Sequence, residues 1–272
     1  AAVSSSEDGT EKLLIELFDG ESVEMVLIPS EERLTFCLST QVGCPVQCRF
    51  CASGRDGLVR NLSAGEIIEE FLLGSERAGR RPDNLVFMGI GEGLLNYNEL
   101  VKALVLLSSP DEFGMSPRRI TVSTSGYVPG ILKFAELERE FNLAISLHAP
   151  DDETRSKLIP PPFCYPVAEI MAAADRYREQ AGRMVTLEYT LLKGVNDSLP
   201  TARKLAALAR SHHAKVNLIP YNATDTEFQR PERRVIEAFA RTVEEEGAHV
   251  TVRVERGAES TAACGQLRRQ EG

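Results

Sequence analysis

The sequence predicts an α/β protein, a partial (β/α)6 barrel preceded by a short β-hairpin extension. Two patterns predict this fold. From about residue 33 onward, short apolar runs alternate with amphipathic helical stretches, which is typical of parallel strands joined by crossover helices. Before that point, Asp19-Gly20 separates two apolar runs, and this pair is the turn chemistry that hairpins prefer. The strand–helix units are too few for a complete eightfold barrel.

The individual elements can be placed along the chain. The polar start, up to about Thr10, is expected to be loose, and the hairpin strands are expected at 12–18 and 22–29. The barrel strands are expected at 33–39, 84–88, 119–123, 142–147, 184–191, 215–219 and 249–254. Helices are expected at 63–73, 96–108, 129–139, 166–180, 199–212 and 231–246, the first of them opened by a capping box, Ser63 and Glu66. The chain is therefore divided into a tail and hairpin, 1–32, and a barrel, 33–272, that ends in a loop carrying Cys264.

Length and composition fit one large globular domain. The 272 residues are 43% hydrophobic, which is enough for a sizeable core. No run approaches the ~20 apolar residues of a membrane helix, and no signal-peptide pattern is visible, so no membrane association is expected. Because the chain starts at Ala1 instead of Met, it is expected to be an excerpt or the product of a trimmed precursor.

Cysteine usage indicates metal-bound or catalytic thiols in a reducing compartment. Four of the six cysteines fall within fifteen residues, and a chain of this length does not need a disulfide framework. Cys44, Cys48 and Cys51 have a C-x3-C-x2-C spacing, which can place three thiolates around one face of an iron–sulfur cubane. The iron left without a protein ligand could bind the amino and carboxylate groups of S-adenosylmethionine (SAM). The alternatives are a zinc site, which normally takes four ligands, and structural cysteines.

Further polar residues follow the predicted strands at the end where ligands gather in parallel barrels. A glycine there lets the backbone approach a ligand closely, and a carboxylate can bind the ammonium of SAM. Each residue alone also fits an ordinary turn, a loop hydroxyl or a structural histidine. The candidates, expected on one rim, are Gly91, Glu92, Ser123, Ser146, Leu147, His148 and Asn222.

Five ordered segments carry a family resemblance. They are TFCLSTQVGC (35–44), VFMGIGEGLLN (86–96), SLHAP (146–150), KVNLIPYN (215–222) and AACGQL (262–267). Together they resemble the RlmN/Cfr family of radical SAM RNA methyltransferases, over almost the whole chain. The resemblance implies a radical-SAM partial barrel, a [4Fe–4S] cluster held by Cys44, Cys48 and Cys51, and SAM contacts at the seven candidate positions on the rim.

The resemblance also implies a mechanism with two SAM molecules per turnover. Cys264 takes a methyl group from one SAM, and a deoxyadenosyl radical made from the second SAM removes a hydrogen from that methyl. The carbon then adds to an electrophilic adenine carbon, which gives a covalent protein–RNA adduct. Cys37 resolves the adduct through a Cys37–Cys264 disulfide. Glu24 matches a position proposed as a general base, whereas Cys164 is expected to be a structural cysteine.

The expected activity is methylation of adenine carbon 2 in 23S rRNA and also in tRNA, and hence a part in rRNA and tRNA processing. Three alternatives stay open: methylation of carbon 8, radical SAM chemistry on a peptide or small molecule, and a zinc-stabilised RNA-binding module without catalysis. An electron donor such as flavodoxin or ferredoxin, a monomeric state and a cytoplasmic location are expected. A plastid or similar organelle is the alternative location if the start is a trimmed precursor.

Charge sets a requirement on RNA binding. The net charge of −9 counts against a free-standing RNA binder, because neutralisation of phosphates carries much of the affinity. A local basic rim can still operate on an acidic protein. The candidates are Arg118, Arg119, Arg253, Arg256, Arg268 and Arg269, each of which alone also fits a solvated surface charge. Members of the family usually carry a helical domain before the hairpin that helps to grip RNA, and the printed sequence does not contain it.

Overall fold

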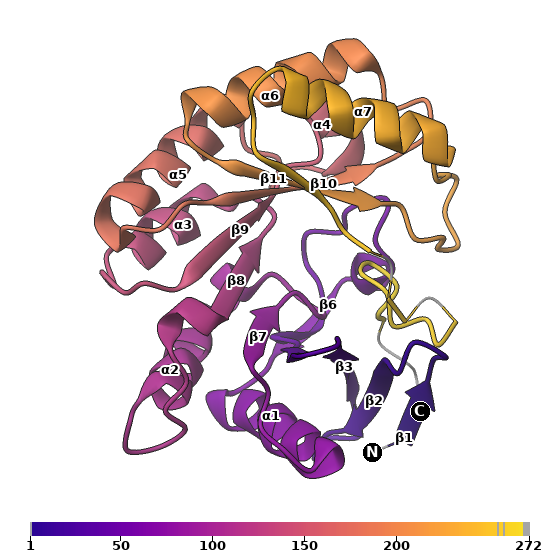
Figure 1. Cartoon of the computed structure of the whole chain (residues 1–272). Coiled ribbons are helices and arrows are strands. Elements are labelled where there is room, and N and C mark those ends of the chain that lie inside the picture. Colours follow the sequence, from indigo (N-terminus) through magenta and orange to yellow (C-terminus); the bar gives the residue numbers. More distant parts are fainter. Residues whose placement is uncertain (1, 255, 258, 269–272) are drawn as a thin grey trace. The chain divides into compact units, whose positions relative to one another are not determined.

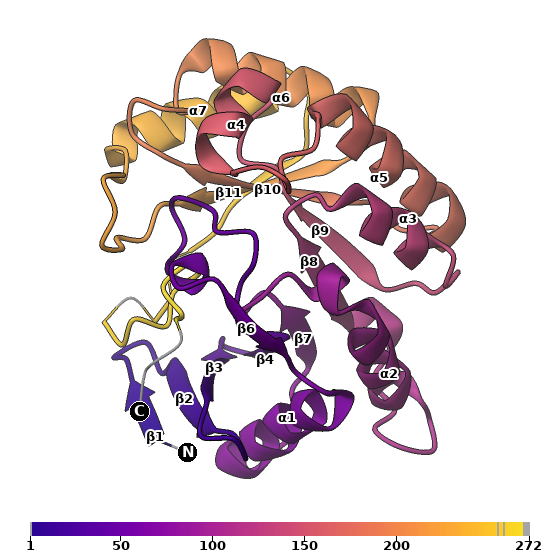
Figure 2. The same ribbon diagram turned by 180° about the vertical axis from the view of Figure 1, so that it is seen from behind.

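The computed structural model describes residues 2–254, 256–257 and 259–268, which divide into two units (Figures 1 and 2). The first unit holds the described residues of 1–47, 51–123 and 256–272. The second unit holds the described residues of 48–50 and 124–255. The cysteine loop therefore begins and ends in the first unit and passes through the second at its middle.

The first unit is built on a mixed sheet. Strands β1 (Ala2–Ser5), β2 (Glu11–Glu16), β3 (Ser22–Pro29) and β4 (Leu34–Cys37) pair antiparallel in that order. The sheet then continues in parallel, because β4 pairs with β7 (Asn84–Phe87) and β7 pairs with β8 (Ile120–Thr124). The carboxyl end of β4, where Cys37 lies, therefore faces the same edge as the carboxyl end of β7, from which Gly91 and Glu92 follow.

Two helices, α1 (Ala64–Ala78) and α2 (Tyr97–Ser108), pack side by side over the outer face of these strands (Figures 1 and 2). Ser63 and Glu66 form the expected capping box at the start of α1, and Gly79 ends the helix in the left-handed region. Beneath α1, the rings of Phe36 and Phe71 meet edge to face with their centroids 6.3 Å apart. This contact packs β4 against α1.

Short elements shape the loops of the first unit. Strand β5 (Gln41–Gly43) pairs antiparallel with β6 (Leu58–Asn61) in a second, two-stranded sheet. The 3-10 helices are η1 (Ala52–Gly54), η2 (Gly93–Asn96) and η3 (Pro117–Arg119). The cysteine loop, residues 44–51, leaves from β5 and returns through η1, so this small sheet holds both of its ends.

The second unit contains four parallel strands with helices outside them. The strands β9 (Asn142–Ser146), β10 (Thr186–Leu191), β11 (Lys215–Pro220) and β12 (Val250–Val252) pair in that order. The helices are α3 (Val128–Ala135), α4 (Asp152–Leu158), α5 (Val167–Ala181), α6 (Leu199–Ser211) and α7 (Arg233–Glu245). Rings of Phe134, Phe141 and Tyr177 stack in its core, and the Tyr177 hydroxyl donates to the Phe141 carbonyl at 2.7 Å.

The α/β prediction with parallel strands is confirmed, and the predicted strands and helices all occur with small shifts of their ends. The prediction of a loose start was wrong, because β1 pairs with β2 although all its side chains are exposed. Backbone hydrogen bonds need no apolar pattern, so no pattern of side chains indicates this strand. Helix α4 and the β5–β6 pair were not predicted either. Among the described helices, none combines the length and the apolar character needed to cross a bilayer.

Two glycines of α1 lead to a matched stability prediction. A Cβ at Gly74 would lie 2.7 Å from Met25 Cε and 2.8 Å from Phe36 Cε2, whereas a Cβ at Gly65 would meet only Ser63 Oγ, at 3.8 Å. We expect Gly74→Ala to lower the free energy of unfolding by about 1–3 kcal/mol through overpacking. Gly65→Ala should raise it by about 0.5–1 kcal/mol through helix propensity. Urea unfolding checks both, and equal effects of the two substitutions would contradict the packing beneath α1.

Candidate active site

The start of the cysteine loop is held in a tight backbone frame. Cys44 N–H donates to the carbonyl of Gly57 at 2.9 Å. A Cβ at Gly43, which has φ +76°, would come within 2.0 Å of that same carbonyl oxygen, so only glycine fits there. On the other side of the turn, a Cβ at Gly54 would lie 2.7 Å from the Cα of Gln47. The loop therefore has one tightly packed path between β5 and η1.

The Cys44 sulfur has the environment of a metal ligand. Burial, together with the nearby Cys51 and Glu92, raises the pKa of Cys44 to about 12, although the backbone N–H groups of Val46 and Gln47 donate to the sulfur and act in the opposite direction. Coordination to iron removes the thiol proton directly, and N–H donors to sulfur are typical of iron–sulfur sites. Cys44 thus fits a cluster ligand better than a free nucleophile.

Cys48 and Cys51 complete the triplet. Cys51 lies in the first unit directly before η1, and Cys48 lies in the second, where Arg49 N–H donates to the Leu158 carbonyl at 3.0 Å. Within the described part of the chain, no three His, Cys, Asp or Glu side chains are arranged to hold a single metal ion. A cubane distributes its thiolates over separate irons, and three thiols within eight residues fit that donor set.

Gly91 and Glu92 lie at the end of β7 as predicted. Gly91 has φ +114°, and a Cβ there would lie 2.7 Å from both Gln41 Cβ and Thr40 Oγ1. Glu92 is buried, its N–H donates to Gln41 Oε1 at 2.8 Å, and its carboxylate accepts from Leu94 N–H at 3.2 Å. The acidic group is therefore fixed close to Cys44, whose pKa it influences.

Cys264 lies on a turn directly beside the cysteine loop. Residues 263–266 form the turn, in which Gln266 N–H donates to the Ala263 carbonyl at 3.0 Å. The carbonyl of Gly265 accepts from the N–H of Ala52 at 2.8 Å. This hydrogen bond joins the residue after Cys264 to the residue after Cys51. Ala263 is buried in this turn, whereas Cys264, Gly265 and Gln266 are half-buried.

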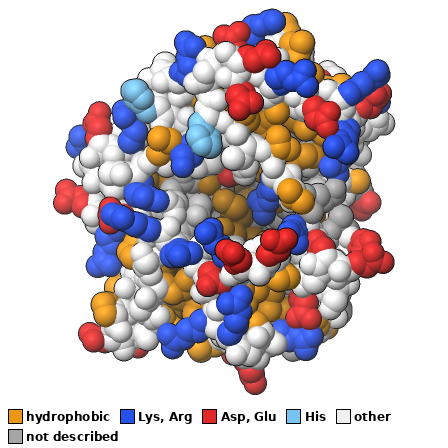
Figure 3. Space-filling model, viewed as in Figure 1, with side chains coloured by type: hydrophobic (Ala, Val, Ile, Leu, Met, Phe, Trp, Pro, Cys, Tyr) orange, Lys and Arg blue, Asp and Glu red, His pale blue; other side chains and the backbone are white. Residues whose placement is uncertain are grey.

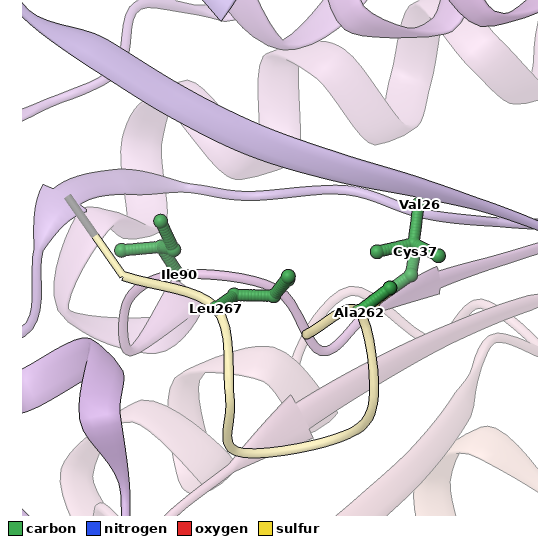
Figure 4. Packing of buried hydrophobic residues seen from close by; sticks show 5 residues of the cluster. All are labelled: Val26, Cys37, Ile90, Ala262 and Leu267. Atoms are coloured by element: carbon green, nitrogen blue, oxygen red, sulfur yellow. The ribbon is translucent and has the colours of Figure 1, made fainter. Parts of the chain in front are cut away.

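Cys37 lies on the other side of the same segment. It is buried at the end of β4 in a cluster with Val26, Ile90, Ala262 and Leu267. Figure 4 shows Ala262 and Leu267, which flank the Cys264 turn, beside Cys37 and Ile90. The structure therefore brings Cys37, Cys264 and Cys51 into one neighbourhood of the first unit. All six cysteines are free thiols, so the Cys37–Cys264 disulfide implied by the resemblance is not formed in this structure.

Glu24 is buried on β3 with both carboxylate oxygens engaged. Oε1 lies 2.8 Å from Lys12 Nζ, and Oε2 accepts from the N–H of Arg268 at 3.0 Å. Glu24, the expected general base, thus contacts the C-terminal segment through the backbone N–H of Arg268.

In the second unit, His148 is a buried neutral imidazole. Burial, with a smaller effect of the Arg155 charge, lowers the pKa of His148 to about 3. Its Nδ1 accepts from Thr190 N–H at 3.0 Å, so the proton of the neutral ring is on Nε2. The ring packs edge to face on Phe50 of the cysteine loop, with centroids 4.7 Å apart. His148 can therefore offer a hydrogen-bond donor and an apolar face, but not a charge at neutral pH.

Sequence reasoning missed Arg155, the largest fully buried side chain among the described residues. Its guanidinium donates to the carbonyls of Ser146 at 3.1 Å and Leu147 at 2.5 Å, and also to that of Ser125. Arg155 thus ties the end of β9 to the segment after β8. Nothing in the sequence marks it, because it lies in the short polar helix α4.

The remaining candidates lie at strand ends as expected. Ser123 is half-buried on β8 in the first unit, and Ser146 is half-buried at the end of β9 in the second. Asn222 is buried two residues beyond β11. Of the arginines considered for RNA contact, Arg269 lies outside the described residues. On the face drawn in Figure 3, basic and acidic side chains intermingle among the described residues, so this face carries no continuous basic surface.

Comparison with known proteins identifies the family. The radical SAM superfamily model matches residues 38–206. The probable dual-specificity RNA methyltransferase RlmN of Heliobacterium modesticaldum is 47% identical over an aligned length of 272 residues. The alignment covers 96% of this chain and 71% of the relative. The chain belongs to the RlmN family of radical SAM methyltransferases. The RlmN of Prochlorococcus marinus is 46% identical over 270 residues, covering 97% of this chain and 75% of the relative.

Solved structures agree with the RlmN assignment. A radical SAM methyltransferase from Sphaerobacter thermophilus is 43% identical, with a TM-score of 0.94 over 98% of this chain and 80% of the other. Streptococcus suis SuiB bound to S-adenosylmethionine has a TM-score of 0.59 over 85% of this chain and 53% of its own, at 15% identity, and shows a shared fold alone. The predicted radical-SAM barrel and enzyme class are confirmed. Membership of this family implies a [4Fe–4S] cluster and SAM.

His148 leads to a pH prediction with a defined sign. Its pKa is 6.5 in the unfolded chain and about 3 when folded, so below pH 6.5 the unfolded state binds the extra proton. Above pH 6.5 this histidine does not change the free energy of unfolding. As the pH drops from 6.5 toward 3, it lowers the free energy of unfolding by about 1.4 kcal/mol per pH unit. Urea unfolding at pH 7 and pH 5 should show a drop that is about 2 kcal/mol larger for the wild type than for His148→Gln. Parallel losses in the two proteins would contradict the buried neutral ring.

Proposed function

We propose that this chain methylates a ring carbon of adenine in RNA, with carbon 2 as the target and Cys264 as the methyl carrier. The observation that carries the proposal is the hydrogen bond from Ala52 to Gly265, because it sets the Cys264 turn against the loop of Cys44, Cys48 and Cys51. The relatives' names support RNA as the substrate. The dual specificity in those names fits two classes of RNA, for which we adopt 23S rRNA and tRNA.

The chemistry requires a radical because carbon 2 of adenine is not nucleophilic, so direct methyl transfer from SAM fails. When bound, a reduced [4Fe–4S] cluster with SAM supplies a deoxyadenosyl radical that removes hydrogen from an unreactive C–H bond. Cys44, Cys48 and Cys51 would hold the cluster. Gly91, Glu92, Ser123, Ser146, Leu147, His148 and Asn222 are the proposed SAM contacts. Two SAM molecules are consumed per turnover, one for the methyl group and one for the radical.

The two outlying cysteines have separate proposed roles. The Cys264 thiolate takes up the methyl group as a thioether. Loss of one hydrogen atom from that methyl leaves a carbon radical, which adds to carbon 2 of adenine. The adduct then loses the carbon-2 proton and returns one electron to the electron-transfer chain that supplied it, which leaves a sulfur–CH2–adenine bridge. The Cys37 thiolate then attacks the Cys264 sulfur, the sulfur–carbon bond breaks, and a Cys37–Cys264 disulfide forms. The carbon keeps the electron pair and takes up a proton, which leaves a methylated base. The burial of Cys37 against Ala262 and Leu267 supports this exchange, since these two residues flank the turn that carries Cys264.

Other parts of the proposal extend the family inference. Glu24 as general base requires one carboxylate oxygen to be released from Lys12 or from the Arg268 N–H. A flavodoxin or ferredoxin as electron donor, a monomeric state and a cytoplasmic location (with a plastid as alternative) stay predictions. Carbon-8 methylation and a substrate other than RNA are the alternative activities.

Cysteine variants test the proposed function. Incubation with SAM, a reductant and unmodified 23S rRNA transcript should yield 2-methyladenosine, identified by mass spectrometry of nuclease-digested RNA. Cys264→Ala should abolish the product and keep the cluster, and Cys37→Ala should accumulate a covalent protein–RNA adduct. Cys164→Ala is the matched control and should remain active. The 8-methyl isomer as sole product would replace the carbon-2 assignment, and an active Cys264→Ala would refute the methyl carrier.

The cluster can be tested without turnover. After anaerobic reconstitution, the wild type should hold about four iron and four sulfide per chain with a brown absorbance. Alanine at Cys44, Cys48 or Cys51 should remove most of this iron, whereas Cys164→Ala should keep it. A colourless protein that binds stoichiometric zinc would refute the cluster and support the zinc-module alternative.

A further inference from the structure

One buried ion pair holds both ends of the Cys264 turn. Lys12 Nζ lies 2.8 Å from Glu24 Oε1, and the two side chains are 7% and 1% exposed. The same ammonium donates to Thr261 Oγ1 at 2.8 Å, three residues before Cys264. The other oxygen of Glu24 accepts from the N–H of Arg268, four residues after Cys264. The ion pair therefore binds the C-terminal segment on both sides of Cys264.

The turn that follows β1 adds further contacts to the part of the segment that precedes Cys264. Asp8 accepts from Thr10 N–H at 2.9 Å through one carboxylate oxygen and from Gly257 N–H at 3.0 Å through the other. The hydroxyls of Ser6 and Ser260 are 2.6 Å apart. A Cβ at Gly257, which has φ +72°, would lie 2.9 Å from Thr10 Cγ2, so a side chain at this position would collide with Thr10. The N-terminal strands and the turn between them thus form a seat for residues 257 and 259–268.

We propose that Lys12 is a positioning residue of the reaction, whose ammonium, together with Glu24, fixes the approach of the Cys264 sulfur to the cysteine loop. This inference rests on the proposed function of Cys264. Lys12 is suited to the role because a buried ammonium requires its carboxylate partner, so the pair has one favourable arrangement. Hydrogen bonds to charged groups are also stronger than neutral ones, which favours the ion pair as the anchor over the serine contact.

Hydrogen exchange in the full chain tests the grip directly, without catalysis. In Lys12→Met, amides of residues 259–268 should exchange on the order of tenfold faster than in the wild type, while peptides from β7 keep their rates. Lys12→Arg should retain most of the protection, because it keeps a buried cation. The control is Arg77→Met, which removes the exposed Arg77–Glu11 pair next to Lys12 in sequence and should leave residues 259–268 unchanged. Equal exchange in Lys12→Met and wild type would overturn the proposal.

Turnover with SAM and 23S rRNA transcript separates positioning from folding. Lys12→Met should lower kcat at least about tenfold with the KM for SAM within about twofold, since the turn is displaced and the SAM contacts are kept. Lys12→Arg should restore kcat to within a fewfold of wild type. An unchanged kcat in a folded Lys12→Met protein would overturn the proposal. If instead Cys264→Ala remains active, the proposed function fails while the exchange result still stands.

Lys12→Met removes the ammonium beside the buried carboxylate of Glu24, which can prevent folding. Two further variants keep the test decisive in that case. Lys12→Met/Glu24→Gln has no unpaired buried charge and should show the same loosened segment. Asp8→Ala changes an exposed residue and should speed exchange near Gly257 a fewfold. Full protection of residues 257–268 in both variants would overturn the proposal.

Discussion

The arrangement of Cys37, Cys51 and Cys264 depends on one constraint, the placement of a late segment of the chain against an early loop. The Ala52–Gly265 hydrogen bond and the contact of Ser53 Oγ with the Leu267 carbonyl at 2.5 Å set the Cys264 turn beside η1. Ala262 and Leu267 anchor the same segment in the core next to Cys37. Without these contacts the cysteine loop and Cys264 would be separate features of the sequence. With them, Cys264 lies on a short segment that contacts both the residues after Cys51 and the buried surroundings of Cys37.

Much of the fold could be predicted because it follows from local pattern. Apolar periodicity marked every barrel strand, and Ser63 with Glu66 marked the start of α1. The elements that were missed have no such pattern: β1 is entirely exposed, and α4 is seven polar-rich residues. The cluster spacing was readable from three nearby cysteines. The grip of Lys12 on Thr261 was not, since it joins opposite ends of the chain through tertiary packing.

The two units use buried charge in different ways. In the first, Lys12 and Glu24 neutralise each other and bind neighbouring backbone and hydroxyl groups. In the second, Arg155 has carbonyl partners instead of a carboxylate, and burial lowers its pKa from the ordinary value while the nearby Cys164 and Cys48 act in the opposite direction. Such a group is stable only where several acceptors surround it. Its carbonyl partners belong to Ser125, Ser146 and Leu147, so this arginine fixes the backbone from which the SAM contacts of the second unit are expected.

The seat of residues 257 and 259–268 also has a consequence for the order of assembly. A ribosome makes this segment after all the strands and helices, so β5, β6 and η1 can fold around Cys44 and Cys51 while the Ala52 N–H is still uncovered. The residues around Cys264 then reach Ala52 and Ser53, so the thiol meets this loop after the strands β1 to β12 have been made.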